Sequence, residues 1–255
     1  AMTEPSNVTR REFGTAGVQS LLMFSLLETI FARDAWSAEV SPITAKWLAG
    51  LNELAGDVKE QRISQVAWQK KVEELYGQIE VDELMKFVDF NGLTKDLKFV
   101  DHGARSLRPK FPEIDGVPKK LVFGKQIFAI KKGQSVVPHG HNNMATAFLV
   151  LQGELHGRHY DRIEDESEHL VIRPTIDASF KPGGVSTVSD YKDNIHWFKA
   201  TSKSAFIFNI HVLGCRPGSA LPTGRVYIDP NGESLDGGLV RARRLNYGEA
   251  HKLFG

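Results

Sequence analysis

Short apolar runs separated by glycine- and proline-containing turns dominate the chain after residue 95, and they constrain its fold more than any other feature. The runs occupy residues 121–123, 127–130, 147–151 and 205–210. The second run is followed by Lys-Lys-Gly at 131–133, a typical turn sequence. Many short strands joined by such turns build a sandwich or a barrel. We therefore predict an antiparallel β-domain over residues 95–255.

Residues 39–94 have a different pattern, because their apolar residues recur every three or four positions. This spacing places the apolar side chains on one face of a helix. The first predicted helix has Ile43, Trp47, Leu51 and Leu54 on that face. Gly56, Gly77 and Gly92 are the expected helix ends. A short helix over residues 247–254 completes an α+β fold with a helical N-terminal region.

The bulk composition is that of an ordinary globular protein. Of 255 residues, 41% are hydrophobic, and 32 basic against 31 acidic residues give a net charge of +1. A chain so close to neutral has no overall field that attracts nucleic acid, so we expect no nucleic-acid partner. Cys215 is the single cysteine, which excludes an intramolecular disulfide. We expect it to be a small buried hydrophobic residue.

Residues 1–38 resemble a twin-arginine export leader. Residues 9–13 read Thr-Arg-Arg-Glu-Phe, and an apolar stretch follows over residues 18–32. Glu28 interrupts this stretch, whose apolar residues also have the spacing of an amphipathic helix. The segment is therefore either a leader, which predicts a periplasmic or exported protein, or an N-terminal helix of a cytoplasmic one.

Three histidines are the strongest chemical signal in the chain. His139 and His141 are separated by one residue, so in a strand both side chains point to the same face. His196 can approach them from a neighbouring strand. Three neutral imidazoles suit a divalent first-row metal and leave coordination positions open for other ligands. We predict that His139, His141 and His196 bind one metal ion.

Asn209 and His211 share one face of a later strand. We predict that they lie near the metal and orient the substrate without binding the ion. His211 has two alternative roles, as a fourth metal ligand or as a core residue.

Polar residues also alternate along the segment after Gly153, as Glu154, His156, Arg158 and Tyr160. If this face lines the barrel, Arg158 or Tyr160 can bind a substrate carboxylate and His156 can act as a general base. If it faces outward, which is the interpretation we favour, these residues are ordinary solvent-exposed ones. Arg158 and Tyr160 are kept as candidate catalytic residues. We expect His159 to be exposed.

Residues 138–153 resemble the first motif of the cupin superfamily, with Pro-His-Gly-His at 138–141 and Leu-Gln-Gly at 151–153. They are most similar to thiol dioxygenases: cysteine dioxygenase, cysteamine dioxygenase and the plant cysteine oxidases. Residues 194–200, Asn-Ile-His-Trp-Phe-Lys-Ala, are similar to a segment of the plant and cysteamine enzymes. The resemblance covers about residues 120–215.

This resemblance implies a cupin-type antiparallel β-barrel, or jelly roll, that holds Fe(II) and uses O2 to oxidise a small thiol to a sulfinate. It places His211 where cysteine dioxygenase has its outer-sphere histidine. Thr146 stands where cupins usually have a glutamate ligand, which thiol dioxygenases also lack. Gly140 stands where these families often have aspartate, and Asn209 stands near an aspartate of the plant enzymes.

Other interpretations are open. Zn, Ni, Mn or Cu also suits three imidazoles. The chain can be a different metal-dependent cupin enzyme, which oxidises a diketone or flavonol-like chelating substrate or catalyses an isomerisation. It can also be a non-catalytic cupin that binds a metal or a small ligand, with its helical region forming a homodimer.

Overall fold

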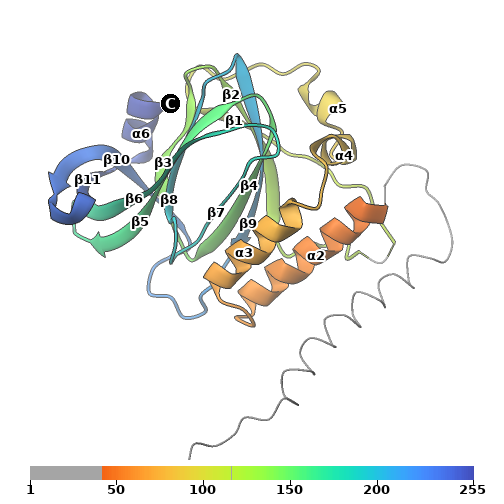
Figure 1. The fold of residues 1–255 in the computed structure, drawn as a ribbon, viewed down its shortest axis with the longest axis horizontal. Helices are drawn as coiled ribbons and strands as arrows, with labels where there is room; N and C mark the ends of the chain where they lie inside the picture. The colour runs from red at the N-terminus through yellow and green to blue at the C-terminus, as the bar shows by residue number, and fades with distance from the viewer. Residues whose placement is uncertain (1–41, 116) are drawn as a thin grey trace, which may run out of the picture. The chain divides into compact units, whose positions relative to one another are not determined.

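The computed structural model describes residues 42–115 and 117–255 (Figure 1). Residues 1–38, for which a leader or a helix was predicted, lie outside this part of the chain. Within it, none of the helices combines the length and the apolar character needed to cross a membrane.

Four helices precede the strands. They are α2 (Pro42–Lys59), α3 (Gln65–Tyr76), α4 (Val81–Phe87) and α5 (Phe90–Thr94). α3 begins after Ser64, whose side chain accepts a hydrogen bond from the backbone N–H of Ala67, and it ends at Gly77 as predicted.

Two of the predicted helix ends are wrong. α2 continues through Gly56 to Lys59, and α5 contains Gly92. Glycine inside a helix costs only about 1 kcal/mol relative to alanine, and burial of the apolar face of α2 offsets this cost. At Gly92, the Asp89 side chain accepts a hydrogen bond from the backbone N–H and caps the start of α5.

Eleven strands follow among the described residues. The first six are β1 (Ala104–Leu107), β2 (Gly124–Lys131), β3 (Ser135–Asn142), β4 (Met144–Gln152), β5 (Leu155–Asp165) and β6 (His169–Phe180). The others are β7 (Val185–Val188), β8 (Ile195–Ala200), β9 (Ser204–Leu213), β10 (Gly224–Leu235) and β11 (Leu239–Leu245). The 3-10 turn η1 (Asp236–Gly238) joins β10 to β11, and α6 (Tyr247–Phe254) ends the chain.

All strand pairs are antiparallel and form two sheets. The first sheet has the order β1-β2-β9-β4-β7. In the second, β10-β11-β6-β5-β8-β3 closes into a barrel, because β10 pairs with β3. We call these the open sheet and the closed sheet. β4 and β9, in the middle of the open sheet, are apolar and buried over most of their length.

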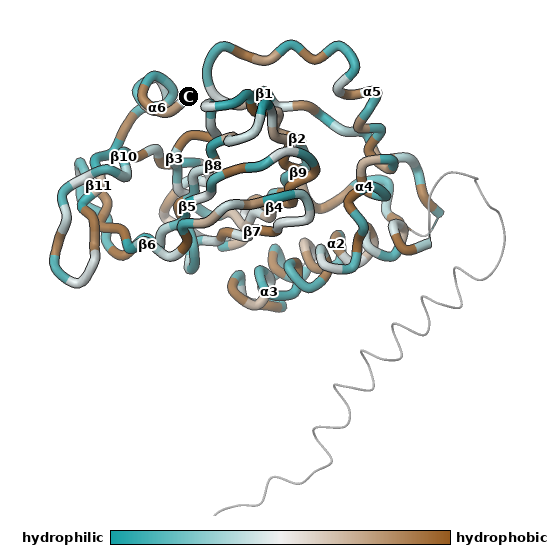
Figure 2. The backbone as a smooth tube through the Cα atoms, turned by 45° about the horizontal axis from the view of Figure 1, so that its top comes forward, coloured by the Kyte–Doolittle hydropathy of each residue, from teal (hydrophilic) through white to brown (hydrophobic). Residues whose placement is uncertain are grey.

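α2 and α3 cover the outer face of the open sheet (Figure 1 and Figure 2). The buried ring of Trp47 in α2 lies 5.6 Å from the ring of Tyr76 in α3 and 6.1 Å from that of Phe208 in β9. Burial of such aromatic side chains contributes much of the favourable free energy of packing, so this contact fixes the helices on the sheet.

The closed sheet buries side chains on both faces. One face packs against the open sheet through a core that includes Val136, Phe148 and Phe198. The other face encloses a separate apolar core that includes Leu170, Ile195 and Ile228. We call the first the intersheet core and the second the barrel core.

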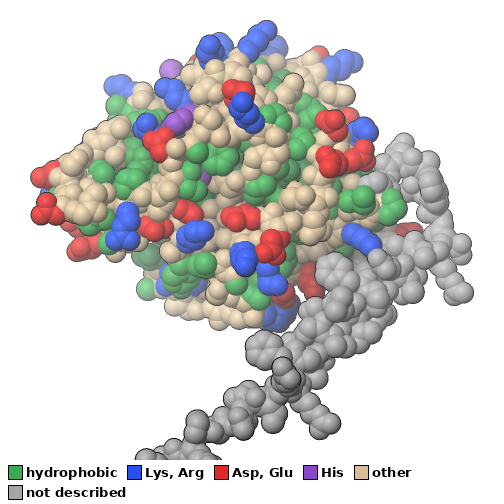
Figure 3. All heavy atoms as spheres, in the orientation of Figure 1, with side chains coloured by type: hydrophobic (Ala, Val, Ile, Leu, Met, Phe, Trp, Pro, Cys, Tyr) green, Lys and Arg blue, Asp and Glu red, His purple; other side chains and the backbone are tan. Residues whose placement is uncertain are grey.

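On the face shown in Figure 3, Lys and Arg are interspersed with Asp and Glu. Arg241 and Arg243 in β11 form ion pairs: Arg241 contacts Glu166 at 2.7 Å, and Arg243 contacts Glu249 at 3.3 Å.

The strand pairing confirms the predicted fold class, an antiparallel β-barrel with a helical N-terminal region.

Candidate metal centre

The three predicted metal ligands lie on adjacent strands of the closed sheet. His139 and His141 are in β3, and His196 is in β8, directly opposite His139 in the register. The β3–β8 register shifts by one residue between Val136 and His139. Directly opposite residues in antiparallel strands point to the same side, so all three imidazoles face the open sheet.

The imidazoles converge on one point. The Nε2 atoms of His139 and His141 are 3.3 Å apart, and one ring nitrogen of each of the three histidines lies within 4.8 Å of the others. Metal–nitrogen bonds of about 2.1 Å at right or tetrahedral angles place two donor atoms roughly 3.0 to 3.4 Å apart. The described residues therefore fit a single metal ion.

Hydrogen bonds at the back of two rings orient them. The Nδ1 atom of His139 lies 2.8 Å from the carbonyl oxygen of Val137, which can only accept, so Nδ1 carries the proton. Its Nε2 atom then keeps a free lone pair. The Nδ1 atom of His141 lies 3.2 Å from the hydroxyl of Thr146. Thr146 thus contacts the ring of His141 at the nitrogen that does not face His139.

Burial keeps the three imidazoles neutral. Their exposed fractions are 5% for His139, 2% for His141 and 1% for His196. Burial, followed by the charge of Arg225, lowers the pKa of His139 to about 3. Burial first and the neighbouring histidines next lower the pKa values of His141 and His196 well below the usual range. Neutral imidazole is the form that binds a metal, so the site needs no loss of protons at neutral pH.

Among the described residues, none of those that line the cavity around the histidines is acidic. Besides the three histidines, its lining consists of Phe128, Met144, Thr146, Phe148, Asn209, His211 and Arg225. It leaves about 10 Å³ for the centre of a water-sized molecule, which is room for about one water or one ion.

Arg225, which the sequence did not reveal, contributes the formal positive charge of the cavity lining. It is the register partner of His141 in β10, so strand pairing brings it to the histidine cluster. After burial, its charge further lowers the pKa of His139 and of His211. Among the described carboxylates, none forms an ion pair with Arg225. No spacing motif links it to the histidines, because it lies 84 residues after His141 (225 minus 141).

Asn209 and His211 line the same cavity from β9, across from the histidines. The Asn209 side chain is engaged on both sides: its Oδ1 accepts a hydrogen bond from Gln126 at 2.9 Å, and its Nδ2 lies 3.3 Å from the carbonyl of Ala147. His211 is outside the converging group of ligands, and its Nδ1 has no partner among the described atoms. Burial, followed by the charge of Arg225, lowers its pKa.

Arg158 and Tyr160 are not brought to this cavity. Arg158 points away from the open sheet, where it contacts Asp177 at 3.1 Å and stacks on Trp197. His156 also contacts Asp177, at 2.7 Å. The outward orientation favoured for this face therefore holds for both residues.

Tyr160 keeps the alternation of β5 and lies on the same face as Arg158. It pairs with Ile195 of β8 and is buried with it in the barrel core. The β5–β6 register shift at this point places the extra residue, Thr175, in β6. Neither Arg158 nor Tyr160 lies where it can contact a ligand in the histidine cavity.

The prediction that His159 is exposed is wrong, because it is 0% exposed. It lies opposite His196 in the register, on the face that packs against the open sheet. Its Nε2 atom is 2.8 Å from the Ser186 hydroxyl in β7, and burial lowers its pKa to about 4. Leu155 and Gly157 share this inward face, so the outward alternation of residues 156 and 158 already implied it.

Cys215 is a buried free cysteine, and burial raises the pKa of its thiol to about 11. It therefore remains a neutral thiol at physiological pH, consistent with the expected hydrophobic residue.

No protein-family model and no curated protein matches this chain. Solved structures do match part of the chain. A protein with a double-stranded β-helix domain from Klebsiella pneumoniae is 17% identical, with a TM-score of 0.33, over 58% of this chain and 94% of that one. A cupin superfamily protein from Desulfitobacterium hafniense is 16% identical, with a TM-score of 0.30, over 46% of this chain and 84% of that one.

An oxalate oxidase in complex with the substrate analogue glycolate is 16% identical, with a TM-score of 0.31, over 42% of this chain. The match spans 46% of the oxidase chain, less than half of its length. Identities and TM-scores this low carry no argument about activity. The fold assignment rests on the strand pairing of this chain, in which six antiparallel strands close into a barrel and five form a second sheet.

Proposed function

We propose that the protein is a mononuclear non-haem iron dioxygenase that oxidises a small thiol to a sulfinate, R–SH + O2 → R–SO2H. The observation that carries this proposal is a buried set of three neutral histidines in a cavity without any acidic side chain. His139, His141 and His196 would hold the Fe(II) ion.

The charge of this site favours a thiol. Three neutral donors leave the whole divalent charge uncompensated, so the site attracts an anionic ligand atom. Iron bound there would supply open coordination positions for the substrate and O2 and would deprotonate the thiol. Binding of both reactants to the same ion would supply the proximity that the reaction needs.

The side chains of the lining have separate roles in this proposal. Phe128, Met144 and Phe148 form an apolar wall that limits the access of water. His211, neutral because its pKa is lowered, hydrogen-bonds the substrate through a ring nitrogen. Asn209 positions neighbouring groups, since its amide is already engaged. Arg225 binds a carboxylate on the substrate.

Diketone- or flavonol-like chelates are one alternative class of substrate, and oxygen uptake with such a chelate but with none of the three thiols below would support it. A non-catalytic metal-binding protein is the other alternative, and the test below separates it from the enzyme.

The test is oxygen uptake by protein loaded anaerobically with Fe(II), with cysteine, cysteamine or 3-mercaptopropionate added. We expect uptake of one O2 per thiol and a sulfinate that carries both atoms of labelled oxygen. Arg225→Gln should raise the KM about tenfold for a thiol with a carboxylate and leave that of cysteamine unchanged, the change expected for one lost charge-assisted hydrogen bond.

Two controls complete this test. His139→Ala should consume no oxygen. Stoichiometric iron binding by the unmodified protein, without oxygen uptake on any of the three thiols, would reject the proposed activity and favour a binding protein.

A further inference from the structure

Asn194 lies where the backbone pairing of β3 with β8 stops. The last register pair is His139 with His196, and continuation by two residues would place His141 opposite Asn194 (139 + 196 = 141 + 194). Asp193 instead has a left-handed backbone with φ of 53°, which turns the chain away at this point. Its N–H is taken by the Asp161 carboxylate in β5, at 2.8 Å.

The Asn194 side chain replaces the missing backbone pair. Its Nδ2 donates to the carbonyl oxygen of His141 at 2.9 Å, and its Oδ1 accepts from the backbone N–H of His141 at 3.3 Å. A hydrogen-bonded pair of residues in an antiparallel sheet exchanges the same two bonds. Only a carboxamide carries the donor and the acceptor that this exchange needs.

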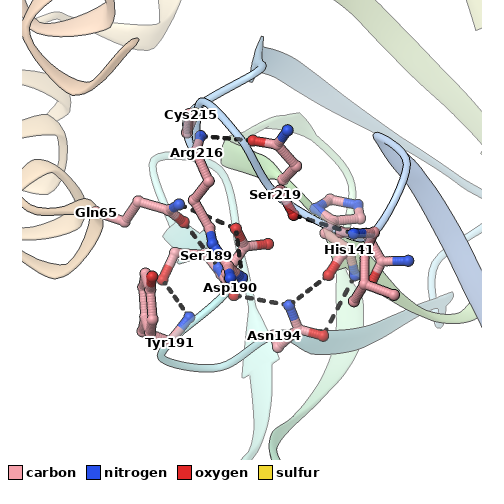
Figure 4. A network of polar contacts seen from close by, with 12 residues as sticks. Gln65, His141, Ser189, Asp190, Tyr191, Asn194, Cys215, Arg216 and Ser219 are labelled. Atoms are coloured by element: carbon pink, nitrogen blue, oxygen red, sulfur yellow. Dashed lines mark hydrogen bonds and ion pairs between the residues drawn. The ribbon is translucent and has the colours of Figure 1, made fainter. Parts of the chain in front are cut away.

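The second proton of the Asn194 amide anchors the group to the helical region. Nδ2 also donates to the carbonyl oxygen of Ser189 at 2.9 Å, and the Ser189 hydroxyl donates to Oε1 of Gln69 in α3 at 2.8 Å. Gln65, also in α3, donates to Asp190 at 3.0 Å. Figure 4 shows Asn194 between the Ser189–Asp190 loop and His141. Asn194, Ser189 and Gln69 are all buried, so loss of one partner would leave uncompensated polar groups.

Gly140 lies so close to the Asn194 amide that it leaves no space for a side chain of its own. A Cβ atom at residue 140 would lie 2.6 Å from Oδ1 of Asn194 and 3.0 Å from Cγ1 of Ile195. A side chain at residue 140 would therefore displace the amide from His141. This close approach explains why the residue between the two histidines is glycine.

We propose that Asn194 is a positioning residue that places His141 for metal binding, with Gly140 providing the space for its amide. The inference rests on the proposed metal site. Asn194 holds the backbone of one ligand and lies two residues before another, His196, so it sets the spacing between ligands from two strands. Removal of groups that orient metal ligands typically weakens metal binding about 10- to 100-fold.

The test compares Asn194→Ala and Asn194→Asp with Gln134→Ala. Gln134 precedes the first residue of β3, at the end opposite His141, and its amide likewise donates to two backbone carbonyls, those of Val100 and Asp101. Co(II) is titrated into each metal-free protein and its visible spectrum is recorded. Both Asn194 variants should bind Co(II) about 10- to 100-fold more weakly, with an altered spectrum, while Gln134→Ala binds it as the unmodified protein does.

A second readout does not need the metal. Exchange of the His141 backbone amide, followed by NMR in the metal-free protein, should accelerate in the Asn194 variants and stay unchanged in Gln134→Ala. Absence of Co(II) binding by the unmodified protein would reject the proposed function, and amide exchange would still decide whether Asn194 holds His141. Unchanged His141 protection, or unchanged Co(II) affinity, in folded Asn194→Ala overturns the inference.

Gly140→Ala provides a variant of the same contact should Asn194→Ala not fold. It should weaken Co(II) binding in the same direction. In a double-mutant cycle, the combined loss should be smaller than the sum of the two single losses, because both changes remove one interaction. Additive losses would show that the two residues act separately, which contradicts the proposed role of Gly140.

Discussion

Ile195 and His196 are adjacent in β8, yet they belong to different regions of the molecule. Ile195 lies in the barrel core, among other aliphatic side chains. His196 lies on the opposite face, in contact with two further histidines and with Phe148. Both are fully buried, so burial does not distinguish them. Their neighbours distinguish them. The side chains around Ile195 form an apolar core that stabilises the fold, whereas those around His196 form the candidate metal site.

The largest effect is expected on the histidine face. His196→Ala should abolish stoichiometric Co(II) binding, because two imidazoles remain of three. The free energy of unfolding of the metal-free protein should change by no more than about 1 to 2 kcal/mol, since Nδ1 of His196 has no hydrogen-bond partner among the described atoms. Metal titration and urea unfolding measure the two quantities. Retention of stoichiometric Co(II) in this variant would show that His196 is not needed for metal binding, and the proposed difference between the two faces would be wrong.

The opposite result is expected one residue earlier. Ile195→Ala should lower the free energy of unfolding by about 2 to 5 kcal/mol, because it leaves a cavity in the barrel core. The fraction that remains folded should bind Co(II) with unchanged affinity. A parallel loss of affinity, measured under conditions where the variant is folded, would show that the two faces are coupled.

A smaller effect is expected on how the stability of the folded protein depends on pH. Burial lowers the pKa of His159 to about 4, against about 6.5 in an unfolded chain. Between these values the unfolded state binds a proton that the folded state does not. Stability is therefore lost as the pH falls below 6.5, by about 1.4 kcal/mol per pH unit for this histidine.

His159→Gln should accordingly reduce the pH dependence of unfolding of the metal-free protein between pH 6.5 and 4 by one proton. His102, which is exposed, provides the matched control as His102→Gln. If the free energy of unfolding depends on pH equally in His159→Gln and in the unmodified protein, His159 does not cause the loss of stability in acid.

The parts of this structure that follow strand periodicity could be predicted from the sequence. The spacing of His139 and His141 predicted a shared face, and the structure brings His196 to them. The short apolar runs predicted strands, and the run at 205–210 lies within β9. These predictions succeed because the two-residue period of a strand is local and is visible in the chain itself.

The parts that depend on register could not be predicted. Arg158 and Tyr160 lie on the same face of β5, yet only Tyr160 is buried, because it pairs with Ile195 in the barrel core. Arg225 reaches the cavity only because β10 closes the barrel against β3, a pairing between strands far apart in the chain. The role of Asn194 depends on the left-handed turn at Asp193, a backbone conformation uncommon for residues other than glycine. Such features arise from tertiary pairing, which a single sequence does not display.

Closure of one sheet also limits how this protein can aggregate. A barrel presents no unpaired strand, so among the described strands only the open sheet has edges, at β1 and β7. At β7, Gln69 of the overlying α3 already donates to the backbone carbonyl of Thr187, at 3.1 Å. Addition of a strand from another chain would therefore have to begin at β1, which has four residues and offers too short a template for a growing intermolecular sheet.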